Sequence, residues 1–203
     1  MKGQAMVQRG MRLGLSLALL GGLSGCLGLG GGTKAPPTLF SLTPSRSLEA
    51  GASLSGKAED ALLVLDPETD RSLAVNRIAV QVDESNVAYL AKAQWVERPA
   101  RLFGTLLAET IRAGGKHMVF TDDEAAPTTK NRLGGRLLAF GYDAREQAVV
   151  VRFDAVKSGA GGALSSRRFE ARVPGVAAKP EQVGPALNKA ANDVAGQVAD
   201  WVG

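Results

Sequence analysis

Cysteine and histidine are almost absent from the sequence, which contains one of each, Cys26 and His117. A single cysteine excludes a disulfide within the chain, and it excludes the cysteine clusters that hold structural zinc. We interpret His117 as an ordinary residue at the edge of a short strand, with a general base or a metal ligand as the alternative. No catalytic residue, metal ligand or cofactor is therefore expected.

Long blocks of like charge are also missing. Of the 24 Lys and Arg residues, three (Lys2, Arg9 and Arg12) fall in a segment that we expect to be removed, and the remaining 21 nearly balance 20 Asp and Glu residues. No basic stripe is left to bind the phosphates of a nucleic acid. The sequence therefore predicts a near-neutral domain that does not bind nucleic acid.

Two further segments lack the residues that would make them ligand sites. Asp66, Glu68 and Asp70 alternate with other residues, but the bidentate glutamate that closes a calcium loop is missing. We interpret them as a solvated turn. Gly28–Gly32 is not followed by the Lys-Ser/Thr pair and helix of a phosphate-binding loop. No ATP site is predicted, so any ATPase must be a separate subunit.

The N-terminal segment has the pattern of a lipoprotein signal peptide. Lys2, Arg9 and Arg12 form a basic region, Leu13–Leu20 is a short apolar region, and Leu23-Ser24-Gly25-Cys26 matches a lipobox. The apolar run is too short to span a bilayer, which takes about 20 residues. We therefore predict a secreted bacterial protein in which Cys26 carries a lipid anchor. The alternative is an ordinary signal peptide that happens to contain a cysteine.

This pattern divides the chain into three parts. Residues 1–25 are the predicted signal peptide, residues 26–37 are rich in Gly and Pro and predict a flexible tether, and residues 38–203 are expected to form a single periplasmic domain. In enterobacteria, an aspartate after the lipidated cysteine retains a lipoprotein in the inner membrane. Leu27 stands at that place here. We therefore predict the periplasmic face of the outer membrane, with the inner membrane as the alternative.

Alternating apolar and polar residues predict several β-strands. The strands are expected at Leu39–Thr43, Ala61–Leu65, Arg77–Val82, Val87–Ala91, His117–Phe120, Arg132–Tyr142, Gln147–Ala155 and Leu164–Val173. Residues 45–60 and 122–129 are polar and predict loops, the first of them poorly ordered. Because short turn segments join the last three strands, these strands should form an antiparallel meander.

Two segments instead repeat apolar residues at steps of three and four, which predicts helices over Pro99–Ala113 and Pro180–Val202. Pro99 suits a first helical turn, and Gly114-Gly115 supplies a stop. The expected fold class is α+β: an antiparallel or mixed sheet with a C-terminal three-strand meander and two helices packed against it.

Four fragments, in this order and spacing, resemble the ABC-type transport auxiliary lipoproteins, the PqiC-like family. Asn86–Pro99 (NVAYLAKAQWVERP) is similar to a segment with the pattern (V/L)AY, (R/Q)W and P. The others are Leu106–Ile111 (LLAETI), Leu133–Phe140 (LGGRLLAF) and Arg168–Pro174 (RFEARVP). The resemblance covers the chain from about Leu39 onward.

The resemblance implies an accessory, non-catalytic role. Proteins of this family work with an ABC transporter and a periplasmic MCE-domain protein thought to move lipids between the two membranes. The lipoprotein would dock the MCE assembly or organise a ring, and the second of these roles would make it a homo-oligomer. The alternative is an envelope-maintenance or outer-membrane assembly lipoprotein that binds another partner.

Tyr89 and Trp95 lie in the family-like segment, and amphipathic aromatic side chains are frequent in interfaces. They are the candidate partner-binding residues. The alternative is that both pack between the sheet and the Pro99–Ala113 helix.

Overall fold

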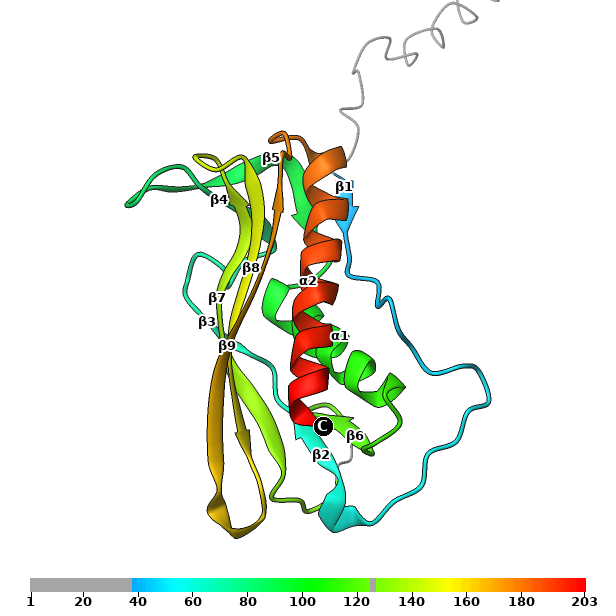
Figure 1. Ribbon diagram of the computed structural model, residues 1–203. Coiled ribbons are helices and arrows are strands. Elements are labelled where there is room, and N and C mark those ends of the chain that lie inside the picture. The colour runs from blue at the N-terminus through cyan, green and yellow to red at the C-terminus, as the bar shows by residue number, and fades with distance from the viewer. Residues whose placement is uncertain (1–37, 125–126) are drawn as a thin grey trace, which may run out of the picture. The chain divides into compact units, whose positions relative to one another are not determined.

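A nine-stranded mixed sheet and two α-helices form the part of the chain that the computed structural model describes, residues 38–124 and 127–203 (Figure 1). The strands are β1 (Thr38–Phe40), β2 (Leu62–Val64), β3 (Glu68–Thr69), β4 (Arg77–Gln81), β5 (Val87–Trp95), β6 (Val119–Thr121), β7 (Arg132–Asp143), β8 (Ala148–Ser158) and β9 (Leu164–Pro174). The helices are α1 (Pro99–Ala113) and α2 (Pro180–Val202). The predicted signal peptide and tether, with Cys26, lie outside the described residues.

β7 is the central strand of the sheet. Along one edge it pairs antiparallel with β8, which pairs antiparallel with β9, so the predicted meander is present. Along the other edge, three short strands follow one another, each parallel to β7. β2 lies opposite Arg132-Leu133, β3 opposite Arg136-Leu137, and β4 opposite Gly141–Asp143. The chain from β2 to β4 therefore runs beside β7 from its start to its end.

The remaining strands extend the sheet beyond this side. β5 pairs antiparallel with β4, β1 pairs parallel with β5, and β6 pairs parallel with β2. The α+β fold class, with its mixed sheet and two helices, is as predicted.

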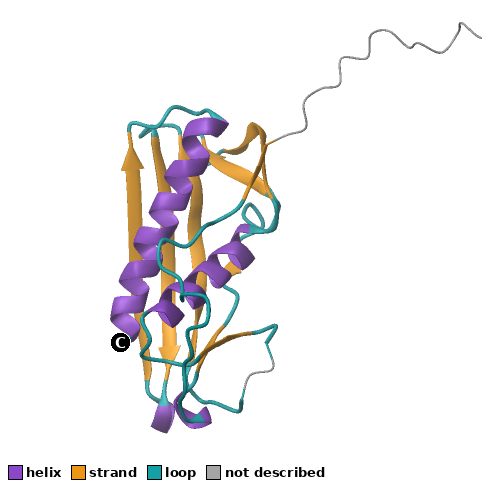
Figure 2. Cartoon of the chain, turned by 90° about the vertical axis from the view of Figure 1, so that its right-hand side faces the viewer, coloured by secondary structure: helices purple, strands orange, loops and turns teal. Residues whose placement is uncertain are grey.

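Both helices lie on the same face of the sheet (Figure 2). They have the predicted bounds, and each starts with a proline, whose fixed backbone angle fits the first helical turn. α2 packs on β8 and β9 and also contacts α1. Its inward stripe includes Val183, Leu187, Val194 and Val198, all fully buried. No helix in the described part of the chain is long and apolar enough to cross a membrane.

Aromatic rings link the layers of the core. The ring centroid of Trp95 lies 6.2 Å from that of Phe40 and 5.3 Å from that of Phe140. Phe103 of α1 lies 5.3 Å from Phe153 of β8. Tilted and edge-on ring pairs at these distances add to the stability gained by burial. They link β1, β5 and β7 to one another, and Phe103 joins β7 and β8 to α1.

Residues 41–48, which we call the strap, lie against the two helices. The backbone N–H groups of Thr43 and Ser45 donate to the side-chain oxygens of Asn188 and Asn192, at 2.8 and 2.7 Å. The backbone N–H of Leu48 donates to Glu109 of α1 at 3.0 Å. The segment after β1 is therefore tied to the helical layer.

Several predicted boundaries were wrong. β5 continues to Trp95 rather than ending at Ala91, because its last three residues pair with β1. β6 begins at Val119, so His117 precedes the strand. β3 was not predicted. Residues 45–60 are a loop as predicted, with one 3-10 turn at Ala58–Asp60, but the strap hydrogen bonds order the start of this segment.

Candidate partner-binding surface

The face of the sheet opposite the helices, which we call the open face, carries a network of ion pairs. Asp154 of β8 accepts two hydrogen bonds from the guanidinium of Arg168 on β9, at 2.6 and 2.7 Å. Glu170 of β9 pairs with Arg152 of β8 and, at 2.5 Å, with Arg172 two residues along its own strand. All five side chains point to one face, because residues directly opposite on paired strands, and alternate residues along one strand, share a side.

The arginines keep these carboxylates ionised. The hydrogen bond from Arg168 holds the pKa of Asp154 below its ordinary value. Burial alone would raise the pKa of Glu170, but hydrogen bonds from Arg152 and Arg172 outweigh burial and lower it. Arg172 also pairs with Glu146. Near neutral pH, these charges balance within the surface itself.

A trough of about 420 Å³ lies on the open face beside the β4–β5 turn and the β7–β8 turn. Small and apolar residues form its floor, among them Ala79, Ala139, Gly141 and Val150. Gly141 is required there, because a Cβ at that position would overlap the backbone carbonyl oxygen of Ala79 on β4. Charged residues, including Glu84, Arg145 and Arg172, surround this floor.

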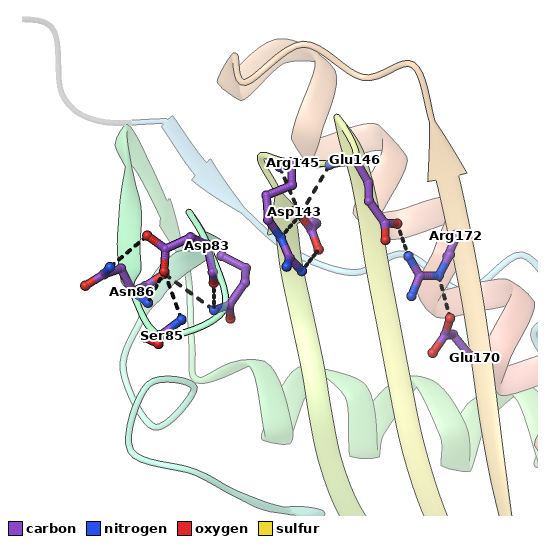
Figure 3. A network of polar contacts seen from close by, with 9 residues as sticks. Asp83, Ser85, Asn86, Asp143, Arg145, Glu146, Glu170 and Arg172 are labelled. Carbon is purple, nitrogen blue, oxygen red and sulfur yellow. Dashed lines mark hydrogen bonds and ion pairs between the residues drawn. The ribbon is translucent and has the colours of Figure 1, made fainter.

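Aspartates fix both turns beside the trough. The carboxylate of Asp83 accepts hydrogen bonds from the side-chain amide of Asn86 at 2.7 Å and from the backbone N–H groups of Ser85 and Asn86 at 2.9 Å each. These bonds lower the pKa of Asp83. Asp143 is held in the same way by the side chain and backbone of Arg145, which lower its pKa (Figure 3). Short loops fixed like this present a defined surface to a partner.

The two candidate aromatic residues are not brought together. Trp95 is 2% exposed and packs in the core against Phe40 and Phe140. Tyr89 is half-buried. Its hydroxyl donates to the carbonyl of Ser72 at 3.3 Å, and the guanidinium of Arg77 lies 4.4 Å from its ring centroid.

A break in the regular geometry of β5 explains why Trp95 is buried in the core while Tyr89 is only half-buried. Tyr89 and Trp95 are six positions apart, and a regular strand would place them on the same face. Lys92 between them has φ 58°, in the left-handed region, and the register with β4 shifts between Arg77 and Ala79. The bulge turns Trp95 into the core and leaves Tyr89 paired with Ala79, whose row includes Gly141 of the trough floor.

The other residues considered from the sequence lie apart from the trough. Asp66 pairs with Arg101, and Asp70 pairs with Arg136, so these two aspartates of the predicted solvated turn serve different ion pairs. His117 precedes β6, and its Nε2 is buried without a hydrogen-bond partner in the described part of the chain. Among the described residues, no group of three His, Cys, Asp or Glu side chains is placed to hold a metal ion.

The ion-pair network and the trough were missed from the sequence. A signal was present in the alternation of Arg152 with Asp154 on one strand and of Arg168, Glu170 and Arg172 on the next. The sequence does not reveal the register that places these two strands side by side. Chemically, the arrangement offers paired charges around an apolar floor, which suits contact with another surface.

The fold and surface define an α+β protein with a mixed sheet, helices on one face, and a charged, troughed open face. A crystal structure of protein XCC0632 from Xanthomonas campestris is similar, with a TM-score of 0.67 at 17% identity, covering 81% of this chain and 94% of that one. A second crystal structure, of an uncharacterized protein, has a TM-score of 0.62 at 12% identity, covering 82% of this chain and 100% of that one. PelC from Paraburkholderia phytofirmans, solved as a dodecamer, is less similar, with a TM-score of 0.44 at 16% identity over 75% of this chain and 91% of that one.

Residues 40–199 match the family model of the ABC-type transport auxiliary lipoprotein component. The chain therefore belongs to this family, as the sequence fragments predicted. No curated protein matches its sequence. The family places the chain among the auxiliary components of ABC-type transport.

Proposed function

We propose that this protein is a non-catalytic component of an MCE-associated ABC transport system that moves lipids between the two membranes. Cys26 carries the lipid that holds it at the periplasmic face of the outer membrane. Residues 26–37 act as a flexible tether that lets the domain extend away from the membrane. The domain docks the MCE-domain protein and, through it, the transporter subunits.

The observation that carries this proposal is the trough on the open face, considered together with the chain's membership of the ABC-type transport auxiliary lipoprotein family. Its floor is apolar, its rim is charged, and both bordering turns are fixed by aspartate hydrogen bonds. A rigid surface loses little conformational entropy when a partner binds, and an apolar centre with a polar rim is the usual composition of an interface.

Co-purification of the full-length protein with its cognate MCE-domain protein in mild detergent tests the proposal. Val87→Lys places a charge in the trough, at a side chain that is 44% exposed. We expect recovery of the partner to fall about tenfold. Val156→Lys is the matched control, because Val156 is 42% exposed and does not line the trough.

Two results would contradict the proposal. If the folded wild-type chain recovers no MCE-domain protein or transporter subunit, the docking role fails. If Val87→Lys and Val156→Lys reduced recovery of the MCE-domain protein equally, the docking surface would not be the trough. Phospholipid bound to the purified chain in the absence of the MCE protein would point to direct lipid carriage instead.

A further inference from the structure

The turn between β4 and β5 carries two negative charges without a cationic partner. Glu84 is exposed and lines the trough, and it forms no ion pair or side-chain hydrogen bond with any residue that the structure describes. The carboxylate of Asp83 accepts hydrogen bonds from Ser85 and Asn86, all of them neutral donors. Because these bonds lower its pKa, Asp83 is ionised near neutral pH.

The arginines that line the trough are already paired with carboxylates of this chain. The pairs are Arg145 with Asp143, Arg152 with Glu170, and Arg172 with both Glu146 and Glu170. Figure 3 shows the pairs of Arg145 and Arg172 beside the acidic turn. The pKa of Arg145 is raised mainly by its hydrogen bond to Asp143, and to a smaller extent by the charge of Glu84. No arginine that lines the trough is therefore left to neutralise the β4–β5 turn.

Apolar surface lies beside these two carboxylates. Val87, the first residue of β5 after the turn, lines the trough and is 44% exposed. Val82, which precedes Asp83, is 43% exposed. The floor of the trough is small and apolar as well. A segment that covers the trough therefore needs apolar side chains in addition to positive charge.

One row of residues across the sheet determines how much room the trough offers. Ala79, Gly141 and Val150 lie opposite one another on β4, β7 and β8, and the larger side chains of Tyr89 and Arg172 end the row on β5 and β9. Since neighbouring strands are about 4.8 Å apart, the backbones of Tyr89 and Arg172 are separated by about 19 Å. An α-helix with its side chains is about 10–12 Å across. The trough therefore has room for a single helix or extended segment.

We infer that the trough binds a cationic segment of the partner, whose lysine or arginine side chains lie against Asp83 and Glu84 while its apolar side chains cover Val87 and the floor. This inference rests on the proposed docking function and names the chemistry of the segment that the MCE-domain protein supplies. A neutral or acidic segment in the same place would take both carboxylates out of water without an opposite charge. Buried charges that lack a partner disfavour binding, so the turn selects against such segments.

The turn holds its charges in place before the partner arrives. The side-chain amide of Gln81 donates to the backbone carbonyl oxygens of Asp83 and Asn86, at 2.5 and 3.4 Å, in addition to the bonds that the Asp83 carboxylate accepts. A turn fixed in this way loses little conformational entropy on binding. Attraction between exposed charges also speeds association and weakens as salt is added. Binding of the partner should therefore depend on ionic strength.

Charge changes at the turn of the full-length chain test the inference, with recovery of the cognate MCE-domain protein in mild detergent as the measurement. We expect Glu84→Lys to lower recovery at least about tenfold and Glu84→Gln about threefold. Raising NaCl from about 50 to about 300 mM should lower recovery by the wild type more than recovery by Glu84→Lys. Glu49→Lys is the matched control, because Glu49 is exposed and does not line the trough, and it should recover the partner like the wild type.

A gain of binding separates the effect of charge from damage to the turn. Ser85 is exposed, and its side chain forms no hydrogen bond within the part of the chain that the structure describes. Ser85→Glu adds a third carboxylate to the turn and should raise recovery about threefold. A damaged turn would not produce such a rise. Ser85→Gln, which is of similar size but uncharged, should recover as much partner as the wild type.

The outcomes distinguish this inference from the proposed function on which it rests. Recovery by Glu84→Lys equal to or above that of the wild type would overturn the inference, and so would a fall in recovery with Ser85→Glu. In either case, a loss with Val87→Lys would still support docking at the trough, through a segment that is not cationic. A folded wild-type chain that recovers no MCE-domain protein would instead contradict the proposed function, and this inference with it.

Discussion

The ring of Phe40 in β1 lies directly against Gly184 in α2. A Cβ at Gly184 would overlap three atoms of that ring, so the helix can approach the first strand this closely only because residue 184 has no side chain. The Phe40 ring also meets the Trp95 ring edge-on. The first strand of the described chain is therefore held between the core and the last helix.

Gly184→Ala should lower the free energy of unfolding. Alanine favours a helix by about 1 kcal/mol over glycine, but the overlap with Phe40 should cost more, with a net loss of about 1–3 kcal/mol. Gly196→Ala in the same helix is the control, because its Cβ would meet only the mobile end of Arg46 at 3.0 Å. Denaturant unfolding of both variants measures the difference. A Gly184→Ala protein as stable as the control would mean that β1 does not hold this position.

Asn192→Ala should loosen the strap. The Asn192 side chain accepts from the backbone of Ser45 and donates to the carbonyl of Thr43 at 2.9 Å, so its removal leaves both groups without this partner. We expect faster hydrogen exchange in residues 43–48 and a loss of about 1–2 kcal/mol in unfolding free energy. Asp193→Ala changes an exposed residue at the next position, and it should alter neither the hydrogen exchange of residues 43–48 nor the unfolding free energy. Unaltered exchange at Ser45 in Asn192→Ala would refute the role of the strap bonds.

Glu170→Gln should destabilise the protein at neutral pH and not in acid. Because the folded-state pKa of Glu170 is lowered, the ionised side chain contributes stability above the pKa it has in the unfolded chain. This contribution is lost as the pH falls through the folded-state pKa. The difference from wild type, about 1 kcal/mol at pH 7, should begin to shrink as the pH falls below about 4.5, the ordinary pKa of a glutamate, and should approach zero once the folded-state carboxylate is protonated.

Unfolding curves recorded across that pH range provide the measurement for Glu170. Glu49→Gln is the control, since Glu49 is exposed and forms no side-chain ion pair within residues 38–124 and 127–203. A difference for Glu170→Gln that stays constant down to pH 3 would show that its pairs with arginine do not stabilise the fold.

Cys26→Ala should abolish lipid attachment. The lipobox sulfur is the atom that would carry the diacylglyceryl group, so the variant should incorporate no labelled fatty acid and should remain unprocessed or free of the outer membrane. Labelling in cells, followed by membrane fractionation, measures both effects. Ser24→Ala keeps a small residue beside the cysteine and should label normally. Incorporation by Cys26→Ala equal to that of wild type would exclude the lipobox interpretation.

The helices and the meander could be predicted because their signals are local. Pro99 and Gly114 mark the ends of α1 in the sequence itself, and the turn at Asp143–Glu146 lies between the two strands that it joins. By contrast, the pairing of β2, β3 and β4 with β7 joins residues far apart in the chain, and β3 has just 2 residues. Alternation predicts strands but does not identify their neighbours.

The candidate surface was harder to predict for the same reason. Whether Trp95 faces the core or the solvent depends on the bulge at Lys92, and nothing in the residue type of Lys92 predicts its left-handed backbone. The trough depends on Gly141 meeting Ala79, a contact between β7 and β4 that exists only in the folded sheet.

The strap also determines when this protein can fold. Its bonds join Thr43 to Asn188 and Ser45 to Asn192, across 145 and 147 positions of the chain. During synthesis, Thr43 and Ser45 therefore lack these two partners until α2 has been made. Contacts of such long range slow folding. The strap can therefore close over the helical layer only after α2 has been synthesised.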